Sequence, residues 1–267
     1  MNPGISPIAF HIGPWPVRWY GIIFSAVIII GTWLATREAK RRGENPDLVW
    51  DGVLIVVILG LIGSRVYHVI HEWDRLYRAN PLAVFYLWNG GLAIYGAIAG
   101  GVLGMIIFAR QARVSVWRWL DIAAPSLLLG QAIGRWSNFI NRELYGYPTD
   151  LPWGVVIEPE YRVPGYEGYE RFQPLFLYES IWNFLVFRLL IYLSRQKRYP
   201  LRDGDIVLLY CALYSLGRFF LEGMKIGDAW TVFGLRTAQI IAACLVVGCS
   251  MILLYRHRPS ASPTTSD

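Results

Sequence analysis

The chain has 267 residues, of which 55% are apolar and only 16% are charged. Soluble domains carry about 25% charged residues, so this composition excludes an ordinary soluble globular domain and favours a protein with lipid as its solvent. The net charge of +6 comes from basic residues scattered over many loops, which argues against nucleic-acid binding and fits contact with anionic lipid headgroups.

Seven segments are long and apolar enough to cross a bilayer as helices, which takes about 20 residues each. The alternating pattern of membrane β-strands is absent, so the sequence predicts an all-α integral membrane protein with seven transmembrane helices. The fourth and sixth segments also contain polar residues. In chain order, the predicted spans are 17–36, 51–70, 91–109, 120–139, 174–194, 205–222 and 237–255.

The distribution of Lys and Arg predicts how the chain is oriented in the membrane. The segments after the first, third, fifth and seventh helices hold 13 of the 25 basic residues, whereas the opposite side holds eight. This pattern predicts an N-terminus outside and a C-terminus in the cytoplasm. One long outer loop, about 141–173, predicts a small extracytoplasmic cap with a β-hairpin around 149–157. Residues 1–257 are predicted to form a single seven-helix membrane domain, and residues 258–267 a disordered cytoplasmic tail.

Polar residues of six predicted helices fall in the outer half of the membrane in this topology. A charged side chain at mid-membrane costs roughly 2.5–3.5 kcal/mol on insertion scales, so such residues usually mark function. Tyr214, Arg218 and Glu222 follow one another at intervals of four residues and share a helix face. The other candidates at this level are Tyr20, Arg65, His68, Tyr95, Arg135 and Asn138.

Three of these candidates, Arg65, Arg135 and Arg218, suit an anionic ligand because the guanidinium fork matches phosphate oxygens. The carboxylates of Glu143, Glu179 and Glu222 would neutralise part of the charge. The sequence has neither a Ser-His-Asp set nor an H-E-x-x-H motif, so hydrolysis by a serine triad or by zinc is not expected. An anionic lipid headgroup is therefore the predicted ligand.

Structural alternatives stay open for several candidates. Arg218 and Glu222 could form a purely structural salt bridge, and Arg65 could organise packing. Tyr20 could be an aromatic residue of the membrane interface. His68 could be a hydrogen-bonded interior histidine, and Glu179 favours a structural role.

The run GRWSNFINRELYG at 134–146 resembles the signature G-R-x-G-N-F-x-N-x-E of prolipoprotein diacylglyceryl transferases. The chain is similar to this family at further motifs in the same order, and the resemblance spans nearly the whole chain. The predicted seven-helix topology is also that of the family. The further motifs are RWYG at 18–21, GSR at 63–65, WNGGLAIYGAIAGG at 88–101, QPLFLYE at 173–179 and YSLGRFFLE at 214–222.

The resemblance implies transfer of the sn-1,2-diacylglyceryl group from phosphatidylglycerol to the lipobox cysteine of a bacterial prolipoprotein, with release of glycerol phosphate. It implies no metal and no cofactor. It also implies a multi-pass protein of the bacterial cytoplasmic (inner) membrane, among membrane lipids, with its active site toward the outer leaflet. Carried over by motif, the phosphate-handling arginines are Arg135 and Arg218, and the other site residues are Tyr20, Asn138, Gly146 and Tyr214. Arg65, Glu143 and Glu222 are expected to help bind phosphatidylglycerol.

The chain departs from the family pattern at the expected general base. Some members have His where this chain has Tyr95, and the same members have Tyr where this chain has His68. One hypothesis is that the base has moved to His68; another is that Arg135 or a bound water assists thiol deprotonation. Ser137 and Gln173 also replace a Gly and a His of the family motifs. The alternative function is a transporter or flippase of an anionic lipid, and a non-catalytic membrane scaffold is a further rival.

Overall fold

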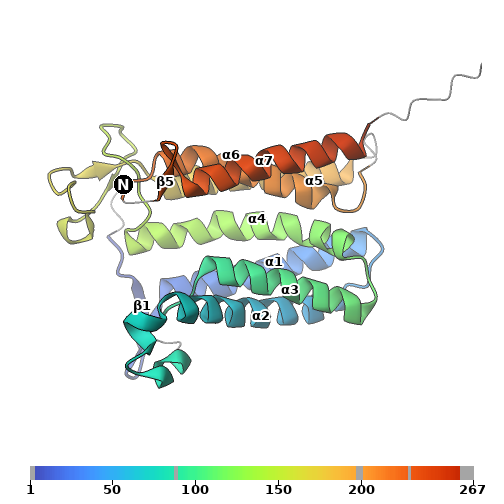
Figure 1. Cartoon of the computed structure of the whole chain (residues 1–267), viewed down its shortest axis with the longest axis horizontal. Coiled ribbons are helices and arrows are strands. Elements are labelled where there is room, and N and C mark those ends of the chain that lie inside the picture. Colours follow the sequence, from blue (N-terminus) through green and yellow to red (C-terminus); the bar gives the residue numbers. More distant parts are fainter. Residues whose placement is uncertain (1–3, 87–89, 197–200, 228–229, 259–267) are drawn as a thin grey trace, which may run out of the picture. The chain divides into compact units, whose positions relative to one another are not determined.

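In the computed structural model, each of the seven predicted spans is helical (Figure 1). The structure describes residues 4–86, 90–196, 201–227 and 230–258. Trp88 and Asn89 of the predicted third-helix motif lie outside the described residues, as does the predicted tail from 259 onward. The long helices are α1 (Trp19–Arg41), α2 (Leu48–His71), α3 (Ile94–Ala112), α4 (Val116–Asn141), α5 (Leu175–Arg195), α6 (Asp205–Gly223) and α7 (Thr237–Arg256).

Six helices in the described part of the chain are long and apolar enough to cross a membrane, which supports a mostly helical multi-pass membrane protein. The exception is α4, which has 26 residues but includes Asp121, Gln131 and Arg135. At 1.5 Å per residue a helix of this length covers about 39 Å, which is enough to cross the hydrocarbon core. The predicted helix is therefore confirmed, whereas a seventh span stays a prediction.

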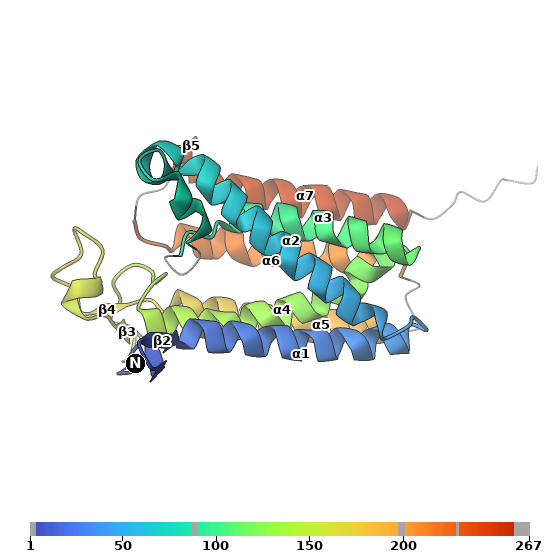
Figure 2. The ribbon, with the colours of Figure 1, turned by 90° about the horizontal axis from the view of Figure 1, so that it is seen from below.

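The chain divides into two compact units, and the division falls within α1 and α4. The middle unit is Thr32–Ala123, and the terminal unit is Met1–Gly31 with Ala124–Asp267. In the middle unit α2 and α3 lie along each other (Figure 2). A Cβ on Gly96 would overlap the Gly63 carbonyl oxygen, and one on Gly100 would overlap the Leu59 carbonyl. Small residues thus allow the backbones of α2 and α3 to pack closely, as in many membrane helix pairs.

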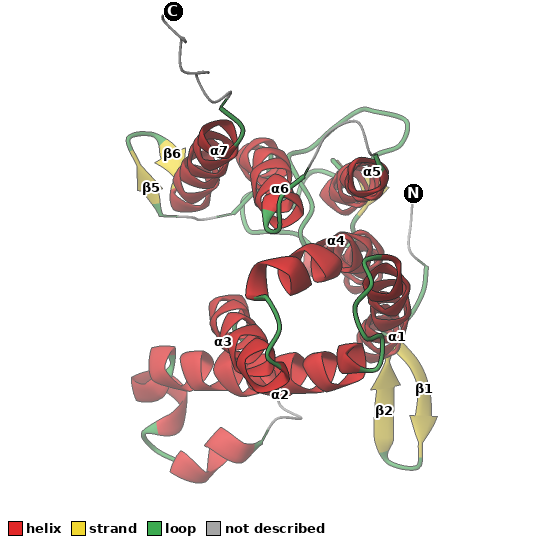
Figure 3. Ribbon diagram, turned by 90° about the vertical axis from the view of Figure 1, so that its right-hand side faces the viewer, coloured by secondary structure: helices red, strands yellow, loops and turns green. Residues whose placement is uncertain are grey.

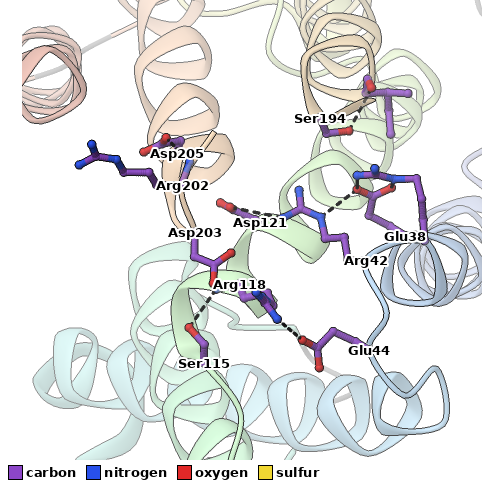
Figure 4. A network of polar contacts seen from close by, with 12 residues as sticks. Glu38, Arg42, Glu44, Ser115, Arg118, Asp121, Ser194, Arg202, Asp203 and Asp205 are labelled. Atoms are coloured by element: carbon purple, nitrogen blue, oxygen red, sulfur yellow. Dashed lines mark hydrogen bonds and ion pairs between the residues drawn. The ribbon is translucent and has the colours of Figure 1, made fainter. Parts of the chain in front are cut away.

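A second feature of the middle unit is a buried ionic network that joins the end of α1 to the start of α4 (Figure 4). Glu38 is buried and accepts hydrogen bonds from Arg41 and Arg42. Arg42 also reaches the buried carboxylate of Asp121 at 3.5 Å. Nearby, Arg118 pairs with Glu44 at 2.9 Å. In the predicted topology these residues lie toward the cytoplasmic side.

In the terminal unit, α6 lies between α5 and α7 (Figure 3). The buried side chains of Leu128, Leu190 and Ile206 form a core among α4, α5 and α6. The Ser180 hydroxyl donates to the carbonyl of Ala132 at 2.8 Å, which ties α5 to α4. On the other side of α5, the Trp182 indole donates to the Leu213 carbonyl of α6 at 2.9 Å. These bonds fix the axial register of the three helices, and hence the level at which their charged residues lie.

The segment between α4 and α5 has its own small core of Tyr145, Val155, Ile157 and Phe172. The predicted hairpin around 149–157 is wrong. Strand β3 (Val155–Val156) instead pairs antiparallel with β4 (Arg171–Phe172), at the far end of the loop. A tight turn from Leu151 to Gly154 follows Thr149, and the backbone N–H of Thr149 donates to the carbonyl of Arg171. Contacts across the loop therefore decide the pairing.

Two short hairpins were not predicted, and each leads directly into a helix of the terminal unit. Strands β1 (Ile8–Ile12) and β2 (Trp15–Arg18) precede α1, and β5 (Thr231–Val232) and β6 (Leu235–Arg236) precede α7. Most of their large apolar residues, among them Phe10, Trp15 and Val232, are exposed. Short helical turns complete the described elements: η1 (Trp73–Tyr77), η2 (Pro81–Phe85) and η4 (Pro159–Tyr161).

Candidate functional site

Two predicted site arginines meet on one buried carboxylate within the terminal unit. Glu179 of α5 contacts Arg135 of α4 through Oε1 at 2.7 Å and Arg218 of α6 through Oε2 at 3.2 Å. The Glu179 side chain is only 6% exposed, whereas those of Arg135 and Arg218 are 22% and 30% exposed. The carboxylate is therefore enclosed, and the two cations that it holds still present part of their surface outward.

The cluster extends along α6 and into the loop that follows it. Arg218 also pairs with Glu222, one turn further on the same helix. Glu222 has two further cationic neighbours, Lys225 at 3.9 Å and Arg236 at 3.7 Å. Four cations thus surround two carboxylates, which leaves a formal surplus of two positive charges. Such a surplus suits an anionic ligand.

Tyr214 lies one turn before Arg218 on α6 and interacts with the Arg135 guanidinium. Its ring stacks on that of Tyr210 at 5.9 Å between centroids, and the Tyr210 hydroxyl accepts a hydrogen bond from Gln131 of α4. Within the predicted stripe, Tyr214 and Arg218 therefore interact with residues of α4 and α5, whereas Glu222 pairs with Arg218 of its own helix.

Asn138 connects Arg135 to Glu143 at the end of α4. Its side-chain oxygen accepts a hydrogen bond from Arg135 at 3.4 Å, and its amide nitrogen donates to Glu143 at 3.2 Å. Asn141 donates to the same Glu143 oxygen at 3.1 Å. The helix ends there because Arg142 adopts a left-handed conformation with φ of 57°, which allows the Glu143 N–H to donate to the Asn138 carbonyl.

The side chain of Arg142 fastens this helix end to the cap and to the N-terminal segment. It pairs with Glu158 at 2.9 Å and donates to the carbonyls of Ile5 and Ile140. The Arg142 guanidinium holds the pKa of the Glu158 carboxyl below its ordinary value of 4.5. In the cap core, burial raises the pKa of the Tyr145 hydroxyl, which donates to the Tyr161 carbonyl.

The predicted glycine, Gly146, lies where three pieces of backbone meet. Its N–H donates to the Gln173 carbonyl at 2.9 Å, and it pairs with Lys225 in an isolated β-bridge. A Cβ at this position would lie 2.8 Å from the Met224 carbonyl oxygen. Gly146 is thus required for close approach of the cap loop to the end of α6, immediately beside Glu222.

The remaining predicted residue of the terminal unit is Tyr20, in the first turn of α1. It is half exposed and stacks on Phe24 with ring centroids 6.2 Å apart. Within the described residues, no hydrogen bond joins Tyr20 to the arginine cluster. Its place at the site stays a prediction.

Arg65, His68 and Tyr95 lie in the middle unit. Arg65 is 8% exposed, and its guanidinium donates to backbone carbonyls of the loop before α3. These acceptors favour the packing role for Arg65 that the sequence left open, and its role as a lipid ligand stays a prediction. The carbonyls are those of Ala83, Val84, Tyr86, Gly90 and Gly91.

His68 and Tyr95 lie in different surroundings within the middle unit. His68 packs edge-on against Tyr77, with centroids 5.9 Å apart, and a Cβ on Gly91 would meet its Nε2 at 2.6 Å. Tyr95 is exposed in the first turn of α3 and packs against Tyr67 at 6.0 Å. Among the described residues these contacts decide between neither hypothesis for the base, and its identity stays a prediction.

Sequence reasoning underestimated Glu179, for which it favoured a structural role. The residue closes the motif QPLFLYE at 173–179, and its charge falls in the first turns of an apolar helix. A carboxylate at that depth, opposite two predicted arginines at the same level, was the signal that could have marked it as their shared partner.

The fold and this cluster define a helical membrane protein that holds several cations and two carboxylates among three of its helices. A family model described as prolipoprotein diacylglyceryl transferase matches residues 7–255. The chain belongs to the prolipoprotein diacylglyceryl transferase family.

Relatives named phosphatidylglycerol–prolipoprotein diacylglyceryl transferase align over most of the chain. The protein of Chloroflexus aggregans is 42% identical over 266 residues, which cover 92% of this chain and 87% of the relative. That of Trichormus variabilis is 44% identical over 244 residues, with 90% and 85% covered. That of Halalkalibacterium halodurans is 42% identical over 260 residues, with 96% and 88% covered.

Proposed function

We propose that this protein transfers the sn-1,2-diacylglyceryl group of phosphatidylglycerol to the lipobox cysteine of a prolipoprotein signal peptide. The reaction forms a thioether and releases glycerol phosphate. Membership of the family supports this proposal, as do relatives whose names state both phosphatidylglycerol and prolipoprotein. The observation that carries it is the arginine pair, Arg135 and Arg218, held by Glu179.

The chemistry makes clear why an arginine pair is needed. The thiol sulfur attacks the glycerol carbon that bears the phosphate, and the carbon–oxygen bond breaks with its electrons on the phosphate oxygen. A second negative charge therefore develops on the leaving phosphate. Two guanidiniums inside a helix bundle stabilise that charge without reorganisation of water. Removal of one such preorganised donor typically lowers kcat by about 10²–10³-fold.

The other predicted residues take supporting roles in this proposal. Asn138 orients Arg135 and Glu143, and Gly146 lets the cap loop approach Met224 at the end of α6. Tyr214 steadies the Arg135 guanidinium from α6. Tyr20 and Arg65 are proposed to border the lipid, and His68 and Tyr95 remain candidates for acid–base work.

We propose the following arrangement in the cell. All seven long helices, α4 included, cross the bacterial cytoplasmic (inner) membrane as one domain. The N-terminus lies outside, the C-terminus lies in the cytoplasm, and the active site opens toward the outer leaflet among membrane lipids. The distribution of Lys and Arg supports this orientation. Cysteine labelling at the β1–β2 turn and at residue 258, from either side of intact cells, would test it.

The test of function is a transfer assay with purified protein, phosphatidylglycerol and a lipobox peptide. We expect the peptide cysteine to gain a diacylglyceryl mass and glycerol phosphate to appear in equal amount. Arg135→Ala and Arg218→Ala should each lose transfer. The matched control is Arg188→Ala, which removes an exposed arginine of α5 outside the cluster and should keep transfer. Absence of transfer by folded wild-type protein in lipid would refute the proposed function.

A further inference from the structure

The two carboxylates of the cluster differ in what holds them. Within the described residues, Glu179 has two ionic partners, Arg135 and Arg218, and both belong to the proposed phosphate site. Glu222 shares Arg218 but also lies near Lys225 and Arg236. A ligand that takes over the guanidiniums of Arg135 and Arg218 would thus remove both ionic partners of Glu179, whereas Glu222 would keep two.

A phosphodiester is such a ligand. The Arg135 Nη2 and Arg218 Nη1 groups, which contact Glu179, are donors of the kind that bind phosphate oxygens. The phosphate group therefore competes directly with the Glu179 carboxylate. Burial penalises a charged carboxylate, and nearby opposite charges compensate for that penalty. Once the arginines turn to the phosphate, the Glu179 carboxylate, whose side chain is only 6% exposed, loses that compensation and becomes a proton acceptor.

We propose that Glu179 is the general base of the transfer and that the bound phosphate activates it by displacing it from Arg135 and Arg218. This inference rests on the proposed function. The thiol proton passes to the Glu179 carboxylate, and the thiolate forms a bond to the glycerol carbon. The carbon–oxygen bond to phosphate breaks, and the leaving phosphate receives its electron pair. Glu179 then returns the proton to that phosphate, so charge and protons balance without any further reagent.

The groups that face Glu179 fit this role. Arg135 approaches Glu179 from α4, and Arg218 and Tyr214 approach it from α6. Glu222 pairs with the other terminal nitrogen of Arg218. A tyrosine hydroxyl has a reference pKa near 10, which makes Tyr a poor proton acceptor at neutral pH. Glu222 keeps Lys225 and Arg236 as cationic neighbours. Glu179 is therefore the carboxylate whose surroundings change when the lipid binds.

The mechanism has a functional consequence. Before phosphatidylglycerol binds, Glu179 is engaged by two guanidiniums and does not deprotonate thiols. The nucleophile is thus generated only when the leaving group is in position, which protects the site from unproductive thiolate formation. The order of events predicts that phosphatidylglycerol must bind before the thiol is activated.

The test compares Glu179→Gln with Glu222→Gln, each assayed with a lipobox peptide and with the same peptide carrying selenocysteine. A selenol is deprotonated at neutral pH and needs no base. General base catalysis contributes about 10²–10⁴-fold, so we expect Glu179→Gln to lose at least about 100-fold with the cysteine peptide. The selenocysteine peptide should restore its rate to within about tenfold of wild type. Glu222→Gln should show the same relative loss with both peptides.

Three results would overturn the inference. The first is full activity of Glu179→Gln with the cysteine peptide, and the second is an equal loss with both peptides, which would assign Glu179 to positioning the arginines. The third is selective selenium rescue in His68→Gln instead of Glu179→Gln. Binding of phosphatidylglycerol vesicles and thermal unfolding of Glu179→Gln show that the variant is folded. Wild-type protein that transfers to neither peptide would refute the proposed function, and the inference with it.

Discussion

Replacing Gly146 by Ala gives a sharp test of how the cap loop supports the arginine cluster. The added Cβ would lie 2.8 Å from the Met224 carbonyl oxygen and 3.1 Å from side-chain carbons of Gln173 and Leu175. Close carbon–oxygen contacts in proteins start at about 3.3 Å, so the overlap is about 0.5 Å. Hydrogen bonds from Gly146 N–H to Gln173 and from Tyr147 N–H to Met224 hold both sides in place.

Relief of this overlap must separate the cap loop from the end of α6. Overpacking of this kind costs about 1–3 kcal/mol. This cost lowers the equilibrium constant for forming the native contact by roughly 5- to 150-fold. Because Lys225 pairs with Gly146 and lies near Glu222, we expect transfer to fall by a similar factor. Hydrogen exchange of the Gly146 and Tyr147 amide protons should accelerate in parallel.

The control lies within the same signature motif. A Cβ on Gly134, in α4, meets no described atom within 4 Å. Gly134→Ala should therefore keep activity and stabilise the helix by about 0.5–1 kcal/mol. Full transfer by Gly146→Ala, or an equal loss in Gly134→Ala, would refute the argument from close approach.

Three further predictions concern the rest of the chain. Arg65→Ala should lower the thermal stability of the folded protein before it lowers lipid affinity, because its guanidinium donates to five loop carbonyls; a pure affinity loss at unchanged melting temperature would contradict this. Gly96→Leu should abolish folded yield in detergent, measured by size-exclusion chromatography, whereas Gly101→Leu should not, since the nearest atom to its Cβ is 3.9 Å away. The stabilisation that the Arg142 pair gives to ionised Glu158 should be fully present above about pH 4.5 and lost as pH falls through the lower folded value, so Glu158→Gln should remove the acid sensitivity of hydrogen exchange in the cap.

The helices could be predicted because membrane spans follow from local composition. An apolar run of about 20 residues has few alternatives in lipid, since every backbone group must be bonded within the segment. The helix α4 shows the limit of that rule. It is helical as predicted, but it carries polar residues such as Gln131 and Arg135, which contact α6 and α5, and it is not among the six candidate spans of the described residues.

The short strands could not be predicted for a different reason. Strands β3 and β4 have two residues each, and their pairing depends on contacts across the cap and not on a repeated pattern. The hairpins before α1 and α7 expose apolar residues on both sides of a tight turn, which in sequence looks like the start of a span. For β3 and β4, therefore, tertiary context decides the structure.

For the site, the sequence identified which residues are charged and predicted their depth in the membrane, but it did not predict which charged groups pair with each other. Arg65 and Arg135 look alike as intramembrane arginines. In the structure Arg65 donates to backbone carbonyls, which are fixed by the chain itself. Arg135 instead pairs with the side-chain carboxylate of Glu179, which an anionic ligand can displace. An arginine bound to fixed backbone carbonyls supports the fold, and one bound to a displaceable carboxylate remains available for a ligand. We expect this difference, which only the three-dimensional structure reveals, to separate a structural arginine from a binding one in this protein.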